Sequence, residues 1–213
     1  MVELRKRKAP AQPLETEQKS KRILELGSAS KRGPKEVKAG DSLADASGNA
    51  HHETPKAGET LDLNKVGGEF ENHDGMKLRL KDLVDISKSG VVLFTYPRAS
   101  TPGCTKQVCL FRDNYESLTS SGLSIYGLSA DSPRANTTFK TKQKLPFPLL
   151  CDPSYTLIAA LGFKKMPKGT TRGVFAINKQ GKVLLRQMGG PDATFEAARQ
   201  VAIASKEEKQ ESP

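Results

Sequence analysis

The most constraining feature of the sequence is a pair of short apolar runs separated by one helical segment. Val91–Tyr96 and Leu123–Leu128 are rich in β-branched and large apolar residues, as expected of strands buried on both faces. Between them, apolar side chains repeat at helical spacing from Pro102 until Gly122, a residue typical of helix ends. A strand, a helix of this length and a second buried strand predict a parallel βαβ unit with a right-handed crossover.

Shorter elements extend this unit on both sides. Phe70–Asn72 and Met76–Leu80 flank a turn and predict one hairpin, and Gly173–Ile177 and Lys182–Arg186 predict another. Further helices are predicted at about Pro133–Lys144, Tyr155–Leu161 and Thr194–Ser205. The order β-α-β followed by β-β-α is the plan of the thioredoxin fold. We therefore predict an α/β protein with a mixed central sheet, flanking helices and extra N-terminal strands.

The first quarter of the chain differs in composition from the rest. Residues 1–57 contain no aromatic residue and many Lys, Ser, Ala, Gly and Pro, which predicts a disordered tail. Of the formal net charge of +10, residues 1–40 contribute +6, with 11 Lys and Arg against five acidic residues. We divide the chain into this basic tail, a folded domain at 58–205 and a charged C-terminal tail at 206–213.

The basic tail predicts a location in the nucleus. Two basic clusters separated by ten residues resemble a bipartite nuclear import signal. The residues of this signal are Arg5, Lys6, Arg7, Lys8, Lys19, Lys21 and Arg22. We expect a nuclear import receptor as a partner, and a weak, salt-sensitive attraction to DNA; a solvated tail without a partner is the alternative. No secretory signal and no membrane span are expected, because no long apolar run exists.

The chemistry that we expect depends on Cys104. This residue falls in the first turn of the predicted helix, where unpaired N–H groups and the helix dipole stabilise a thiolate, the reactive form of cysteine. A buried structural thiol is the alternative. Cys109 lies five residues further along, and in an ideal helix the two Cα atoms are ~8–9 Å apart, beyond the ~7 Å limit of a disulfide. A bond between them requires the helix to unwind.

The remaining cysteine and the histidines do not predict a metal site. The three cysteines form no C-x-x-C pair, and His51, His52 and His73 lie in the tail or in a turn. We interpret Cys151 as a small apolar residue near the start of a short helix.

The segment around Cys104 resembles the active site of a known family. Pro97-x-x-x-Thr101-x-x-Cys104 matches the active-site signature of the peroxiredoxins, and Arg172 precedes a strand where that family carries its active-site arginine. The resemblance runs from about residue 59 to 203. The spacing of Cys104 and Cys109 is similar to the cysteine spacing of the peroxiredoxin Q, or bacterioferritin-comigratory, branch. The basic tail is similar to that of the nuclear thiol peroxidase of fungi.

The resemblance implies a thiol-dependent peroxidase acting on hydrogen peroxide and alkyl hydroperoxides in antioxidant defence. A sulfenic acid on the first cysteine would be captured as an intramolecular disulfide, which thioredoxin returns to the dithiol with NADPH as the distant electron source. No flavin, haem or metal is implied, and we expect a monomer. The implied site residues are Cys104 (peroxidatic), Cys109 (resolving), Thr101, Arg172 and Pro97 (active site), and Gly103 (substrate-binding).

Two other classes of function are alternatives to a peroxidase. A thioredoxin-like thiol–disulfide oxidoreductase would need C-x-x-C and a Thr-Pro pair before the hairpin strand, whereas this chain has C-x-x-x-x-C and Thr170-Thr171-Arg172. A chromatin-bound interaction protein with a vestigial enzyme fold is supported by the basic tail alone, and that tail is compatible with catalysis.

Overall fold

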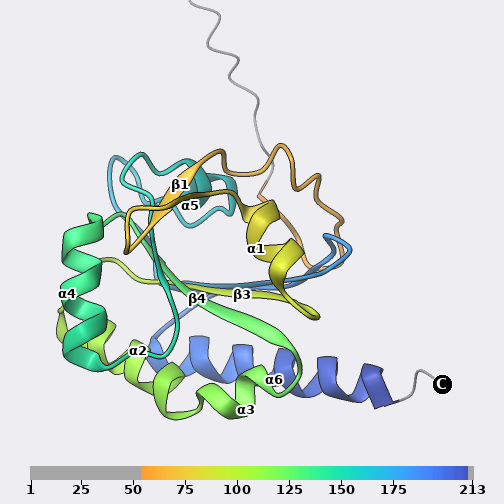
Figure 1. The fold of residues 1–213 in the computed structure, drawn as a ribbon. Helices are drawn as coiled ribbons and strands as arrows, with labels where there is room; N and C mark the ends of the chain where they lie inside the picture. The colour runs from red at the N-terminus through yellow and green to blue at the C-terminus, as the bar shows by residue number, and fades with distance from the viewer. Residues whose placement is uncertain (1–53, 211–213) are drawn as a thin grey trace, which may run out of the picture. The chain divides into compact units, whose positions relative to one another are not determined.

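The computed structural model describes residues 54–210, which form one seven-stranded sheet with helices on both faces (Figure 1). The strand order is β2-β1-β5-β4-β3-β6-β7. The strands are β1 (Phe70–Asn72), β2 (Lys77–Leu78), β3 (Gly90–Thr95), β4 (Leu123–Ser129), β5 (Leu149–Cys151), β6 (Gly173–Asn178) and β7 (Val183–Met188). The helices are α1 (Leu80–Ile86), α2 (Pro102–Asp113), α3 (Tyr115–Thr119), α4 (Pro133–Gln143), α5 (Thr156–Ala160) and α6 (Pro191–Gln210).

The predicted βαβ unit forms the centre of the sheet. Strand β3 pairs in parallel with β4, in the register Gly90↔Leu123, and antiparallel with β6, in the register Gly90↔Asn178. Strands β6 and β7 form the predicted antiparallel hairpin. This arrangement confirms the thioredoxin-like α/β fold, and β1 and β2 are the extra N-terminal strands, joined to the sheet through β5.

The central strand separates two apolar cores. Val92 and Phe94 point into a core shared with α2, α3, α4 and α6, whereas Val91 and Leu93 point into a core shared with α1 and α5. Figure 1 shows α1 and α5 on one side of the sheet and α2, α3 and α6 on the other. All six residues of β3 are buried, which explains why its sequence is continuously apolar rather than alternating.

The N-terminal hairpin is shorter than predicted, because a helix that the prediction missed begins inside its second strand. Only Lys77–Leu78 form β2, and Leu80 begins α1. The backbone N–H of Arg79 donates to the Asp82 carboxylate at 2.7 Å, which caps the helix. The buried residues of α1 are Leu80, Leu83 and Val84, which are at helical spacing. The short alternating pattern of the predicted strand therefore overlaps the start of a helical pattern.

The helix predicted from Pro102 to Gly122 is two helices. Asn114 separates α2 from α3, with φ −115° and ψ 17°. Its side-chain Nδ2 donates to the Leu110 carbonyl at 2.9 Å. A side-chain amide that competes for backbone carbonyls in this way disfavours a continuous helix.

Two further expectations were wrong in their bounds or type. Cys151 lies in β5, which the prediction missed, and not near the start of a helix; the short helix there begins at Thr156. Helix α6 begins at Pro191 and extends to Gln210, so residues 206–210 of the predicted C-terminal tail are helical. Pro191 suits a first helical position, and the Lys, Glu and Gln residues that follow Ser205 are good helix formers.

Residues 1–53 and 211–213 lie outside the described part, so the predicted disorder of the tail stays a prediction. Pro55, three residues before the predicted domain boundary, is buried, and at the boundary the Gly58 N–H donates to the Val183 carbonyl at 2.8 Å. Of the helices within 54–210, none is both long and apolar enough to cross a bilayer.

Candidate active site

The start of helix α2 presents free backbone donors. Thr101 is the N-cap residue, with φ −85° and ψ 153°, and Pro102 is the first helical residue, as predicted. The Thr105 N–H donates to the Thr101 carbonyl at 2.8 Å, so the N–H groups of Gly103 and Cys104 precede the first intrahelical bond. These two donors and the positive end of the helix dipole favour an anion here.

Cys104 lies in a closed, partly apolar environment. It is the third residue of α2 and is only 1 % exposed. It belongs to the core that contains Tyr96, Val108 and Phe111, of which the last two share its helix face. The sulfur is therefore surrounded mainly by apolar side chains. Because such surroundings disfavour a charged thiolate, a cation beside the sulfur is needed to make it reactive.

Arg172 supplies that cation. Its Nη2 lies 3.3 Å from the Cys104 Sγ. Arg172 immediately precedes β6, whose first residue Gly173 pairs with Thr95 at the end of β3. The Gly189 N–H donates to the Arg172 carbonyl at 3.2 Å, which ties this position to the end of β7 as well. The sheet register thus brings a permanently charged guanidinium to a thiol 68 residues away in the sequence.

A second polar residue, which the sequence analysis missed, orients the arginine. Gln107 is fully buried; its Oε1 accepts from Arg172 Nη1 at 2.6 Å, and its Nε2 donates to Thr194 Oγ1 at 3.0 Å. The Thr194 hydroxyl lies 3.0 Å from the Gly190 carbonyl, at the start of α6. The sequence does contain a pattern that could have indicated this residue. Gln107 follows Cys104 by three positions and is polar on a helix face that is otherwise apolar.

Gly103 provides the room that the guanidinium needs. A Cβ at this position would lie 3.2 Å from Arg172 Nη2 and 4.0 Å from its Cζ. The arginine therefore lies against the bare backbone of the helix start, and any side chain at residue 103 would press on it.

The loop before α2 contains the other two predicted residues. The Thr101 hydroxyl donates to the Arg98 carbonyl at 2.9 Å, so its oxygen lone pairs are left to accept a hydrogen bond. Pro97 is exposed and follows Tyr96 at the end of the central strand. The structure thus gathers Cys104, Arg172 and Gly103 directly, and places Thr101 at the cap of the same helix.

Cys109 lies on the same continuous helix as Cys104. Both thiols are free; Cys104 is buried, whereas Cys109 is partly exposed. The Cys109 Sγ lies 3.7 Å from the Gln143 Oε1 at the end of α4, and Gln143 in turn accepts at its carbonyl from Arg112 Nη1 at 2.8 Å. The helix is intact from Pro102 to Asp113, so this is the shape in which the two cysteines cannot bond.

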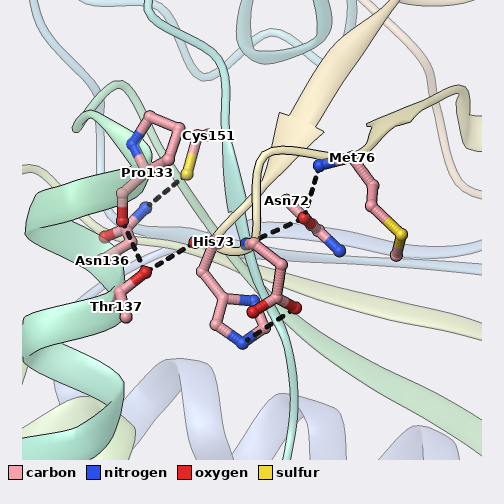
Figure 2. A network of polar contacts seen from close by, with 8 residues as sticks. Asn72, His73, Met76, Pro133, Asn136, Thr137 and Cys151 are labelled. Carbon is pink, nitrogen blue, oxygen red and sulfur yellow. Dashed lines mark hydrogen bonds and ion pairs between the residues drawn. The ribbon is translucent and has the colours of Figure 1, made fainter.

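Cys151 belongs to a separate buried polar network, shown in Figure 2. Its Sγ lies 3.1 Å from the Nδ2 of Asn136, and the residue has no exposed surface. Burial raises the pKa of the Cys151 thiol to about 11. It is therefore a protonated thiol at neutral pH, in agreement with its interpretation as a small buried residue.

The remaining candidate residues are those of the import signal and the histidines. The residues of the import signal, together with His51 and His52, lie outside the described part of the chain. His73 is buried, with its Nε2 3.4 Å from the Asp74 carboxylate. Within residues 54–210, no three His, Cys, Asp or Glu side chains gather closely enough to hold a metal ion.

Comparison with known proteins identifies the class. Residues 61–186 match the model of the AhpC/TSA family, which is more than half of the chain. The chain is 48 % identical over 94 residues to peroxiredoxin bcp1 of Schizosaccharomyces pombe, covering 44 % of this chain and 47 % of that protein. It is 40 % identical over 112 residues to the putative peroxiredoxin MT2597 of Mycobacterium tuberculosis, covering 49 % of this chain and 71 % of that protein. The crystal structure of peroxidoxin BcpB from Mycobacterium tuberculosis is also similar, with a TM-score of 0.62, 32 % identity, and coverage of 70 % of this chain and 97 % of that one.

The chain therefore belongs to the AhpC/TSA family, the enzymes known as peroxiredoxins or thiol peroxidases. Its relatives place it with the Bcp and Q peroxiredoxins. This is the branch whose cysteine spacing resembles that of Cys104 and Cys109. The match spans about half the length of the fission yeast relative.

Proposed function

We propose that the chain reduces hydrogen peroxide and alkyl hydroperoxides through Cys104. The observation that carries the proposal is the 3.3 Å contact between Arg172 Nη2 and a buried Sγ at the start of a helix. A fixed guanidinium and two free N–H groups stabilise the thiolate in a setting that otherwise excludes charge. The same donors can bind an oxygen that becomes anionic during the reaction.

In the first step, the Cys104 thiolate attacks one peroxide oxygen and the O–O bond breaks. The other oxygen leaves with the bonding electron pair, takes up a proton, and departs as water or an alcohol. Cys104 becomes a sulfenic acid. The Thr101 hydroxyl accepts the peroxide O–H, while Arg172 and the N–H of Gly103 or Cys104 donate to the peroxide oxygens and hold them in line.

In the second step, the Cys109 thiol attacks the sulfenic sulfur, an S–S bond forms, and water leaves. An ideal helix keeps the two Cα atoms ~8–9 Å apart, so the first turns of α2 must unwind before the bond can form. A thioredoxin dithiol then reduces the disulfide and is itself oxidised, with NADPH as the ultimate electron source. No bound cofactor takes part in this cycle.

Three cysteine variants test the scheme. Cys104→Ser should abolish peroxide consumption, Cys109→Ser should allow one turnover but no thioredoxin-supported cycling, and Cys151→Ser is the matched control with unchanged turnover. Mass spectrometry after one equivalent of peroxide should detect a Cys104–Cys109 bridge. Turnover by Cys104→Ser would refute the assignment, and a Cys104–Cys151 or intermolecular bridge would refute the resolving role of Cys109.

We further propose that the enzyme acts in the nucleus as a monomer. The support is the basic composition of residues 1–57, whose two clusters suit an import receptor and whose charge could attract DNA weakly. A fluorescently tagged full-length chain should accumulate in nuclei. A uniform distribution between nucleus and cytoplasm would count against the import signal.

A further inference from the structure

The loop between β3 and α2 holds a conformation that its own sequence does not favour. Ser100 has φ 62°, in the left-handed region that a residue with a side chain seldom adopts. Pro97, Arg98 and Ser100 are all exposed, and of the four residues 97–100 only Ala99, with a single methyl group, packs against the core. The next residue, Thr101, is the N-cap of α2 and belongs to the proposed active site. Some other contact must therefore hold this loop in place.

That contact comes from Asp131, which follows β4. Its Oδ2 accepts from the Ala99 N–H at 2.7 Å. Within residues 54–210, no other hydrogen bond from 97–100 reaches another element; the Arg98 carbonyl bonds only to Thr101 inside the loop. At 2.7 Å this N–H···O distance is that of a well-formed hydrogen bond. Asp131 thus anchors the middle of the loop.

Asp131 is itself held by a buried polar cluster. Its backbone N–H donates to Ser129 Oγ at 3.2 Å, and the Asn136 Nδ2 donates to the same oxygen at 3.2 Å. The Oδ1 of Asn136 accepts from the Tyr96 hydroxyl at 2.8 Å. Asn136 is fully buried and also contacts the Cys151 Sγ, as Figure 2 shows. The segment 129–136 therefore holds both the residue before the loop and the middle of the loop.

We propose that Asp131 is a positioning residue for peroxide reduction. By holding the Ala99 N–H, it keeps the Ser100 turn formed and thereby fixes Thr101 and the first N–H groups of α2 around Cys104. The role rests on the proposed function of Cys104 and Thr101. It requires an oxygen acceptor at residue 131 but not a negative charge, so an asparagine should replace the aspartate whereas an alanine should not.

The test compares Asp131→Ala and Asp131→Asn with Asp85→Ala, a control that removes a carboxylate from the surface pair with Lys81. Peroxide reduction by Cys104 is measured in a single turnover, separately from the later disulfide step. We expect Asp131→Ala to be slower by about tenfold or more, since a small misplacement of positioning groups is costly. Asp131→Asn and the control should stay within about twofold of the wild-type rate, which corresponds to a nearly unchanged activation free energy.

Hydrogen exchange of the Ala99 amide provides a readout that does not depend on peroxidase activity. It should speed up in Asp131→Ala and return to the wild-type rate in Asp131→Asn. An unchanged peroxide rate or unchanged Ala99 exchange in Asp131→Ala would overturn the proposal. So would an asparagine variant as slow as the alanine variant, which would indicate a charge effect, or a large loss of thermal stability in both variants. A wild-type protein that consumes no peroxide would refute the proposed function, and with it the catalytic part of this role, while the exchange data would still decide whether Asp131 holds the loop.

Discussion

Replacement of Gln107 by Met tests whether the orientation of the arginine matters for catalysis. The methionine keeps the length and burial of the side chain but removes the oxygen that accepts from Arg172 Nη1 at 2.6 Å. It also removes the donor to the Thr194 hydroxyl, but that hydroxyl keeps its own hydrogen bond to the Gly190 carbonyl at 3.0 Å. The main loss is therefore one hydrogen bond to a charged group.

The size of the effect follows from that bond. A hydrogen bond to a charged group contributes about 1.5–3 kcal/mol, and every ~1.4 kcal/mol in the activation free energy changes a rate tenfold. If the bond holds Arg172 in its reactive orientation, the second-order rate constant for peroxide reduction should fall by roughly 10- to 100-fold. The disulfide step, which does not use the guanidinium in the proposed scheme, should keep its rate.

The assay is stopped-flow measurement of peroxide consumption and sulfenic acid formation in one turnover. Gln107→Glu is the informative partner variant, because it restores an oxygen acceptor for Arg172 and should recover part of the lost rate. Gln200→Met changes a glutamine on the exposed side of α6 and is the matched control. A rate for Gln107→Met within about twofold of the wild type, the change that ±0.5 kcal/mol would cause, would refute the idea that this contact orients the arginine.

Four further outcomes are expected. Gly103→Ala should slow peroxide reduction, because its Cβ would lie 3.2 Å from Arg172 Nη2 and push it away; an unchanged single-turnover rate would show that the guanidinium has room to move. Burial, with Lys140 as a second cause, lowers the pKa of His73 below its usual 6.5, so folding stability should be complete above pH 6.5 and fall as the pH drops below it. Urea unfolding at pH 7.5 and 5.5 should show this loss in the wild type and a smaller one in His73→Gln. Amide exchange over residues 105–111 should speed up in the disulfide form, and equal protection in both states would contradict local unwinding. Removal of residues 1–57 should leave the peroxidase rate unchanged and release the protein into the cytoplasm; a loss of activity would mean that the removed residues belong to the fold.

The sequence was most informative where a single element carries the signal. The continuous apolar run of β3 and the start of α2 at Pro102 are local patterns with one physical interpretation each, and both were predicted correctly. The errors occurred where a short pattern fits two structures. Lys77–Leu78 alternates like a strand, but the next residues form α1, and only the tertiary burial of Leu80, Leu83 and Val84 decides between the two.

The active site shows the same division between local and long-range information. Cys104 could be assigned from the helix start alone, because the chemistry of a first turn is local, whereas Gly103 was implied by the resemblance to the peroxiredoxins. Gln107 could not be assigned, since its role depends on partners 65 and 87 residues away, Arg172 and Thr194. Its pattern only indicates a polar residue on a buried face, which must find a partner of some kind. The fold supplies that partner by placing β6 and the start of α6 beside the same turn of α2, and a buried glutamine thereby connects the charged group of the site to the last helix of the domain.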